Sequence, residues 1–128
     1  MNREQKRAEH ALATWSGLAD DARRDPNVTV DDFRTLANGF GPQILRSGLV
    51  AAVAFVRRYR NQEAANRLLR HLAGADIPAL TGTAPNALLA KVSTLNAADY
   101  MLATREALHV ALWLRRAGQA GAEAEAEA

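Results

Sequence analysis

The hydrophobic residues of this chain recur with the period of an α-helix. Near the N-terminus they fall three and four residues apart, at Ala8, Ala11, Leu12, Trp15, Leu18, Ala19 and Ala22. This spacing places them on one helical face and leaves the opposite face polar. Asp25, Pro26 and Asn27 follow and favour a turn. We therefore predict a long amphipathic helix from about Asn2 to Arg24.

The next two predicted helices are separated by a glycine-containing turn. The first begins near Thr29, whose hydroxyl is expected to cap the helix, with Asp32 at the capping-box position. The sequence Asn38-Gly39-Phe40-Gly41 is predicted to end it or bend it sharply. Pro42 suits the first turn of another helix, which is predicted to reach Tyr59. Because its middle, from Leu49 to Phe55, has no polar residue, we expect this helix to run through the core.

The second half of the chain continues the helical pattern. A fourth helix is predicted over residues 62–73, with Gly74 as its end. Residues 75–85 contain two prolines and a glycine, so we expect a surface loop. A short apolar helix is predicted over residues 86–92. Asn96 is expected to cap the final helix, with Asp99 at its third position.

This final helix is the most apolar of the set. Its core side is predicted to carry Ala103, Ala107, Val110, Ala111 and Leu114, while Tyr100, Met101, Leu108 and Leu112 widen the apolar arc. The remaining strip carries Glu106 together with Arg105, His109, Trp113 and Arg116. Trp113 has two interpretations: a loop or the first helix covers it, or it belongs to a contact with another protein, because tryptophan and arginine are enriched at such contacts.

No segment of the sequence requires a β-strand. We predict an all-α fold, a single-domain bundle of about six helices with long first and last helices. A chain of 128 residues is long enough to bury its own core. The bundle is expected to span residues 1–118, followed by an Ala/Glu-rich tail over residues 119–128 that we expect to be disordered.

The sequence contains no recognisable catalytic or metal-binding motif. Cysteine is absent, which excludes thiolate zinc sites and cysteine nucleophiles. His10, His71 and His109 lie far apart along the chain, and neither a nucleophile elbow nor a phosphate-binding loop is present. We therefore expect a protein that is not an enzyme, with no metal, no cofactor and no small-molecule substrate.

The sequence also indicates no membrane association. The N-terminus begins an amphipathic pattern where a signal peptide would have an apolar region. The longest uncharged apolar run, from Gly48 to Val56, is about half the length of a membrane span. We expect a soluble, cytoplasmic protein.

The basic residues are mostly arginines. Formal net charge is +2, and the chain without Glu123, Glu125 and Glu127 is near +5; only Lys6 and Lys91 are lysines. The arginines that could gather at one helical corner are Arg57, Arg58, Arg60, Arg67 and Arg70. They could hold a sugar-phosphate backbone. Equally, they could be solvated side chains favoured near a helix C-terminus.

Several packing motifs occur in order along the chain: Gln5 to Ala8 with Ala11 and Leu12, Pro42 to Leu49 before a helix rich in alanine, Tyr100, Thr104 to Leu108, and Trp113 to Arg116. Together, over nearly the whole chain up to Ala120, they resemble the small helical subunit of the Cmr complex, the type III-B CRISPR effector. The loop at residues 75–85 and the Ala/Glu tail depart from the family pattern.

The resemblance implies a non-catalytic structural subunit of an antiviral ribonucleoprotein. Such subunits stack with like subunits beside the backbone subunits and line the channel for target RNA, while cleavage belongs to other subunits. The expected partners are thus other Cmr subunits, like subunits in a short stack, and the backbone of guide and target RNA. On this interpretation the five corner arginines contact RNA, and Arg105, His109, Trp113 and Arg116 contact a neighbouring subunit.

Two other interpretations remain open from the sequence. The small subunit of the type III-A Csm effector has a similar helical architecture and role. A DNA-binding regulator is the alternative of another class, because residues 30–37, the turn at 38–41 and the helix from Pro42 imitate a helix-turn-helix. The apolar run from Leu49 to Phe55 argues against it, since a recognition helix needs an exposed polar face.

Overall fold

The computed structural model describes residues 1–127, with side chains described as far as Ala122, and all of its regular structure is helical. The elements in chain order are α1 (Arg3–Arg24), α2 (Val30–Ser47), α3 (Leu49–Arg57), α4 (Gln62–Gly74), the short 3-10 helix η1 (Pro85–Ala87), α5 (Leu88–Thr94) and α6 (Ala97–Glu127). Residues 1–127 contain no strand. The predicted all-α fold of about six helices, with long first and last helices, is confirmed.

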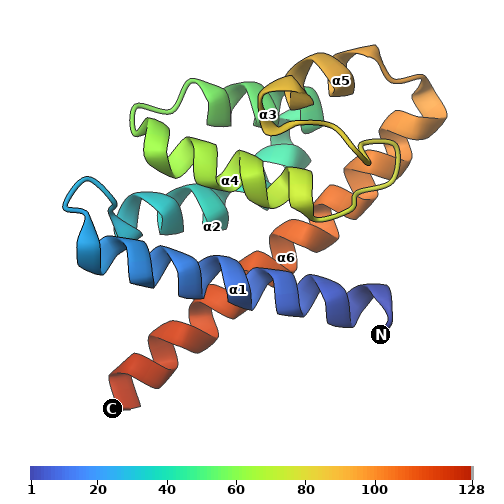
Figure 1. Cartoon of the computed structure of the whole chain (residues 1–128). Helices are drawn as coiled ribbons and strands as arrows, with labels where there is room; N and C mark the ends of the chain where they lie inside the picture. The colour runs from blue at the N-terminus through green and yellow to red at the C-terminus, as the bar shows by residue number, and fades with distance from the viewer. Residues whose placement is uncertain (128) are drawn as a thin grey trace.

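Helix α6 runs along one side of the bundle, and α1 crosses it (Figure 1). Helix α2 also packs on α6, and α3 and α4 pack against α2, while α5 lies against α3. The predicted inner face of α6 is confirmed, because Ala103, Ala107, Val110, Ala111 and Leu114 are all buried. The small residues on this face allow α1 and α2 to approach α6 closely.

Asparagine side chains cap the N-terminal ends of three helices. At α1, the Asn2 side chain accepts from the backbone N–H of Gln5, whose own side chain accepts from Asn2 N–H. Asn61 Oδ1 accepts from Ala64 N–H at the start of α4 (3.1 Å), and Asn96 Oδ1 accepts from Asp99 N–H at the start of α6 (2.9 Å). The predicted cap at Asn96 is confirmed.

The predicted turn at residues 38–41 is wrong. Helix α2 continues through these residues and through Pro42, and the chain breaks instead at Gly48. The φ angle of a proline is compatible with an α-helix, and its missing N–H removes only one backbone hydrogen bond. Pro42 also lies on an exposed face of the helix. Gly48 has a φ of 91°, in the region that favours glycine, so it ends α2 and starts α3. Because residues 30–47 form one helix, the helix-turn-helix interpretation fails.

Three further expectations differ from the structure. Thr29 precedes α2 but makes no cap to the backbone; its hydroxyl donates to Asp32 Oδ2 at 2.6 Å instead. The segment at residues 75–84 is not merely a surface loop, because Ile77 and Leu80 are buried and fasten it to the core. In the apolar arc of α6, Met101 and Leu112 are exposed, at 71% and 43%.

The last helix also extends past the expected domain boundary at residue 118. The backbone of α6 is helical to Glu127, through residues 119–127 of the Ala/Glu-rich segment that was predicted to be disordered. Alanine and glutamate are strong helix formers, so a helix that is already nucleated by packing tends to continue through them. Residue 128 lies outside the described part of the chain.

Candidate functional site

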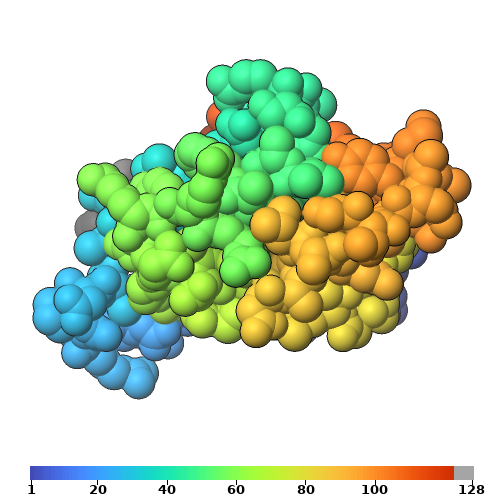
Figure 2. Space-filling view, turned by 90° about the horizontal axis from the view of Figure 1, so that it is seen from above, coloured from blue at the N-terminus to red at the C-terminus, as the bar shows by residue number. Residues whose placement is uncertain are grey.

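Four of the five corner arginines are exposed around the junction of α3 and α4: Arg57, Arg58, Arg60 and Arg70. Arg57 and Arg70 line one shallow hollow together with Gln62, Asn66 and Asn86. Figure 2 shows this face, on which the end of α3 and α4 (green) adjoin the segment that contains η1 and α5 (yellow to orange). The hollow therefore has two guanidiniums and several amide side chains within reach of one bound group.

The loop between α3 and α4 is held by polar contacts that fix this arrangement. Gln62 Nε2 donates to the carbonyl of Tyr59 (2.6 Å), and Asn61 Nδ2 donates to Asp32 Oδ2 (2.7 Å). Hydrogen bonds from Thr29 and then Asn61 lower the pKa of Asp32, helped by the charge of Arg60. Arg60 Nη2 lies 3.7 Å from Asp32 Oδ1, and its side chain remains 85% exposed. The loop is thus tied to the start of α2.

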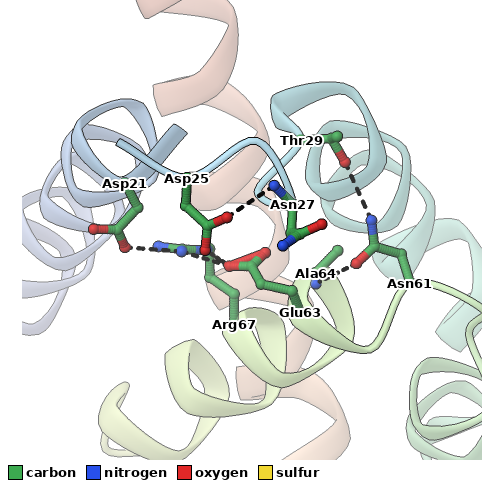
Figure 3. A network of polar contacts seen from close by, with 8 residues as sticks. All are labelled: Asp21, Asp25, Asn27, Thr29, Asn61, Glu63, Ala64 and Arg67. Atoms are coloured by element: carbon green, nitrogen blue, oxygen red, sulfur yellow. Dashed lines mark hydrogen bonds and ion pairs between the residues drawn. The ribbon is translucent and has the colours of Figure 1, made fainter. Parts of the chain in front are cut away.

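Arg67 does not join the exposed arginines. Its guanidinium is buried between α4 and α1, where Nη2 donates to Asp21 Oδ2 (2.9 Å) and Nε donates to Glu63 Oε1 (2.9 Å), as Figure 3 shows. Burial alone would lower the pKa of Arg67, but its hydrogen bonds and ion pairs with Glu63 and Asp21 raise it. Arg67 ties α4 to α1, so its guanidinium is not presented to a ligand at the α3–α4 corner.

The predicted contact strip of α6 lies beside the N-terminal half of α1. Arg105, His109 and Arg116 are exposed, whereas Trp113 is half-buried. The Arg116 guanidinium stacks 5.3 Å from the centre of the Trp113 ring. Trp113, His109 and Arg116 line a hollow whose other wall is formed by α1 residues, including Arg3 and Arg7. Helix α1 therefore covers part of Trp113, and the strip beyond it stays accessible.

Glu106 was assigned by sequence to the exposed strip, but it is only 3% exposed. Arg3 Nη1 donates to its Oε1 (2.6 Å) and Arg7 Nη1 to its Oε2 (3.2 Å). Burial alone would raise the pKa of Glu106; the hydrogen bond and charge of Arg7, and then those of Arg3, outweigh burial and hold the pKa low. The spacing of Arg3 and Arg7 by one helical turn was the sequence signal for this pairing.

An apolar groove between α2 and α6 was not anticipated. It has a volume of about 690 Å³ and lies on the opposite side of His109 from the α1 hollow. Leu45, 76% exposed, and Leu112 stand at its edge, and Ala37, Gly41 and Ala111 form its floor. The charged residues that line it are Arg46, Arg115 and the titratable His109. The sequence did not predict this groove because it predicted a turn at residues 38–41. Only a continuous α2 places Ala37, Gly41 and Leu45 along one helical face.

Among the described residues, no cluster of three or more His, Cys, Asp and Glu side chains is arranged to hold a metal ion. Within the same part of the chain, none of the helices combines the length and apolar character needed to cross a bilayer.

Comparison with known proteins identifies the family of this chain. A family model described as "CRISPR-associated protein (Cas_Cmr5)" matches residues 3–121, so this is a CRISPR-associated protein. A crystal structure of a CRISPR-associated Cmr5 family protein from Thermus thermophilus shares the fold, with a TM-score of 0.74 and 24% identity over 94% of this chain and 96% of that chain. None of the curated proteins matches. Because the family model spans nearly the whole sequence, the chain belongs to the Cmr5 family.

Membership of the Cmr5 family supports a subunit of the type III-B Cmr complex. It also decides between the two effector types left open by the sequence, in favour of Cmr over Csm.

Proposed function

We propose that this chain is a non-catalytic structural subunit of a Cmr ribonucleoprotein effector in antiviral defence. In this role it stacks with like subunits beside the backbone subunits and lines the channel for target RNA. Family membership supports the assembly, and the exposed arginines Arg57, Arg58, Arg60 and Arg70 support the contact with RNA. The observation that carries the RNA contact is the shared hollow lined by Arg57 and Arg70.

The buried ionisable groups support a structural rather than a catalytic role. Within the fold, Arg67 pairs with Asp21 and Glu63, and Glu106 pairs with Arg3 and Arg7. Burial, reinforced by the charge of His10, lowers the pKa of His71 to about 3, so this imidazole stays neutral at ordinary pH. Arg67 joins α4 to α1 and Glu106 joins α6 to α1, so these buried charges are engaged in contacts between helices.

The RNA contact is tested with the double variant Arg57→Glu and Arg70→Glu in the reconstituted Cmr complex. Each phosphate contact contributes about 0.7 to the slope of log affinity against log salt for single-stranded RNA. We expect weaker target-RNA binding and a slope reduced by about 1.4 for the two lost contacts. The measurement is a filter-binding or fluorescence titration at several salt concentrations.

The matched control is Arg23→Glu with Arg24→Glu, which makes the same charge change at the exposed end of α1. An equal change of slope in the two double variants would show a general effect of net charge and would contradict an RNA contact at the α3–α4 corner.

We propose that a neighbouring subunit of the complex binds to the surface formed by Arg105, His109, Trp113 and Arg116. The stacked Trp113 and Arg116 pair and the adjoining apolar groove support this surface, since rigid aromatic and arginine side chains at an apolar patch are typical of protein contacts.

Reversal of Arg105 and Arg116 to Glu is expected to lower the number of copies retained in the reconstituted complex, as measured by native mass spectrometry. Both side chains are exposed, so the isolated variant should keep its circular dichroism and melting temperature. The Arg23 and Arg24 double variant again serves as the control. If the folded variant assembled with unchanged stoichiometry, the contact with the neighbouring subunit would have to lie on another surface.

A further inference from the structure

The groove between α2 and α6 is an apolar surface that the fold leaves open. Leu45 and Leu112 at its edge are 76% and 43% exposed, and its floor consists of the small residues Ala37, Gly41 and Ala111. An exposed apolar patch with a polar rim is typical of a contact with another polypeptide. Small floor residues also let a bound helix approach closely. The groove therefore suits a helix with small side chains.

The rim of this groove is positively charged. Arg46 stands on the α2 side and Arg115 on the α6 side, and both are exposed. Among the described side chains, neither guanidinium forms an ion pair with a carboxylate. Two copies that met groove to groove would bring their basic rims together, and like charges repel. The charge of the rim therefore favours an acidic occupant.

The C-terminal segment of this chain, residues 119–128, has the matching chemistry. It consists of alanine, glycine, one glutamine and the three glutamates Glu123, Glu125 and Glu127, without a basic residue. The helix macrodipole favours cations near a helix C-terminus, yet the last turn of α6 contains none. The stability of their own helix therefore does not explain these glutamates. Their charge is opposite to that of the groove.

Helical spacing arranges the segment in the way that the groove requires. At about 100° per residue, Ala120, Gly121 and Ala124 share one face of α6. By the same spacing, Glu125 borders this face on one side and Glu127 on the other. A face of small residues between two carboxylates thus matches a floor of small residues between two guanidiniums.

The segment also has the right length, and it has to come from another copy. Residues 37–45 of α2 span about 12 Å at about 1.5 Å per residue, and residues 119–127 of α6 span the same distance. Residues 108–115 of α6 form the other wall of the groove, so a continuation of the same helix cannot fold back onto them. Figure 1 shows this end of α6 (red) extending past α1, away from the other helices.

We propose that residues 119–127 of one copy bind in the α2–α6 groove of the next copy, with their glutamates beside Arg46 and Arg115. This contact rests on the proposed stacking of like subunits, and it assigns a segment and a surface to that stacking. Each copy offers its segment at one place and its groove at another, so the contact is heterologous. Heterologous contacts leave a free groove and a free segment at the two ends, and further copies can therefore be added.

Sedimentation equilibrium of the isolated full-length chain, over a range of protein concentrations, tests this contact. We expect the parent chain to self-associate. Arg46→Glu with Arg115→Glu should raise the dissociation constant by about tenfold or more, because like charges then face each other across the contact. The control Arg23→Glu with Arg24→Glu makes the same charge change at the exposed end of α1 and should associate as the parent does.

Two changes in the segment should have the same effect as the change in the groove. One is removal of residues 119–128, and the other is replacement of Glu123, Glu125 and Glu127 by glutamine, which keeps the length and removes the charge. Both variants should keep the circular dichroism of the folded bundle. A truncated chain that self-associates as tightly as the parent would overturn the proposal, and so would a parent chain that stays monomeric.

A mixture of two variants tests whether the segment and the groove are partners. The truncated chain keeps an intact groove, and the variant with Arg46→Glu and Arg115→Glu keeps an intact segment. Each should be monomeric alone, whereas their equimolar mixture should form dimers and no larger species. A mixture that stays monomeric would contradict the pairing of segment and groove.

Native mass spectrometry of the reconstituted Cmr complex separates failure of this contact from failure of the proposed stacking. If the complex keeps several copies of the truncated chain, the segment contact is overturned and stacking remains. If it holds one copy of the parent chain, stacking is contradicted, and sedimentation of the isolated chain decides the segment contact. If truncation removes copies from the complex although the isolated parent is monomeric, the segment binds a different subunit and the contact between copies is overturned.

Discussion

At the scale of single residues, His71 shows how burial sets a protonation state. Its ring stacks on that of His10, with centroids 4.1 Å apart and planes within 10° of parallel. His71 Nδ1 lies 2.6 Å from the Thr14 hydroxyl, and the residue is 3% exposed. Burial, and next the charge of His10, lowers the pKa of His71 to about 3. The folded protein therefore excludes a proton that the unfolded chain accepts.

This difference predicts acid sensitivity in a defined range. Below about pH 6.5 the unfolded chain protonates His71 while the folded one does not, so the free energy of unfolding falls as the pH decreases towards about 3. One such group contributes up to about 1.4 kcal/mol per pH unit. Urea unfolding of His71→Gln between pH 7 and pH 5 should show a correspondingly shallower dependence. An equally steep dependence in the variant would refute this account.

Residue type alone did not predict which arginines are buried. Arg7 and Arg67 are paired with carboxylates 99 and 46 positions away in sequence, whereas Arg57 and Arg70 face solvent. The sequence located the arginine corner because Arg57 and Arg70 lie close along the chain. It misplaced Arg67 because the position of Asp21 depends on how α1 packs against α4.

At the scale of elements, the crossing of α1 and α6 depends on one glycine. Trp15 of α1 donates from Nε1 to the carbonyl of Leu114 at 2.7 Å. A Cβ at Gly118, one turn further along α6, would lie 2.7 Å from Cε2 of the same indole. The helices approach closely here only because residue 118 has no side chain, since carbon atoms at that distance overlap.

Gly118→Ala is therefore expected to lower the free energy of unfolding by about 1–3 kcal/mol, the usual effect of overpacking. Gly39 is the matched control, because it lies within α2 and a Cβ there meets nothing within 4 Å. Gly39→Ala should raise stability by about 0.5–1 kcal/mol through the higher helix propensity of alanine. Chemical unfolding of both variants measures the difference, and a stabilised Gly118→Ala would contradict the proposed crowding.

Element boundaries were predicted where local chemistry decides them. Asn2, Asn61 and Asn96 mark helix starts because a short polar side chain satisfies backbone donors in its own neighbourhood. The boundary at Gly48 was missed in favour of one at residues 38–41. Tertiary contacts explain the difference: Gly41 lies against Ala111 of α6, and the Tyr100 hydroxyl accepts from Val50 N–H beside Gly48.

At the scale of the whole molecule, one core organises the fold around α6. Its buried face ends near Ala117 and Gly118, and residues 119–122 are exposed. The helical pattern of the sequence was sufficient to predict this bundle, because each amphipathic helix has one face to bury. The groove between α2 and α6 could not be predicted, since it depends on how two helices distant in sequence diverge.

Removal of residues 119–128 should accordingly leave the melting temperature within about 2 °C of the parent value, because residues 119–122, which follow directly after the buried face of α6, are exposed. Truncation after Trp113 removes the buried Leu114 and the acceptor of Trp15, and should unfold the chain or lower its melting temperature strongly. Thermal unfolding followed by circular dichroism tests both truncations. Strong destabilisation by the shorter deletion would extend the folded domain beyond residue 118.

The proline inside α2 leaves one backbone carbonyl of this helix without its usual donor, at a residue that lines the apolar groove. Because Pro42 has no N–H, the carbonyl of Asn38 lacks the donor that an α-helix normally supplies. Both residues line the groove. A polypeptide that binds in the groove with an N–H donor beside this carbonyl would gain a hydrogen bond there, and that bond would fix the register in which the two chains meet.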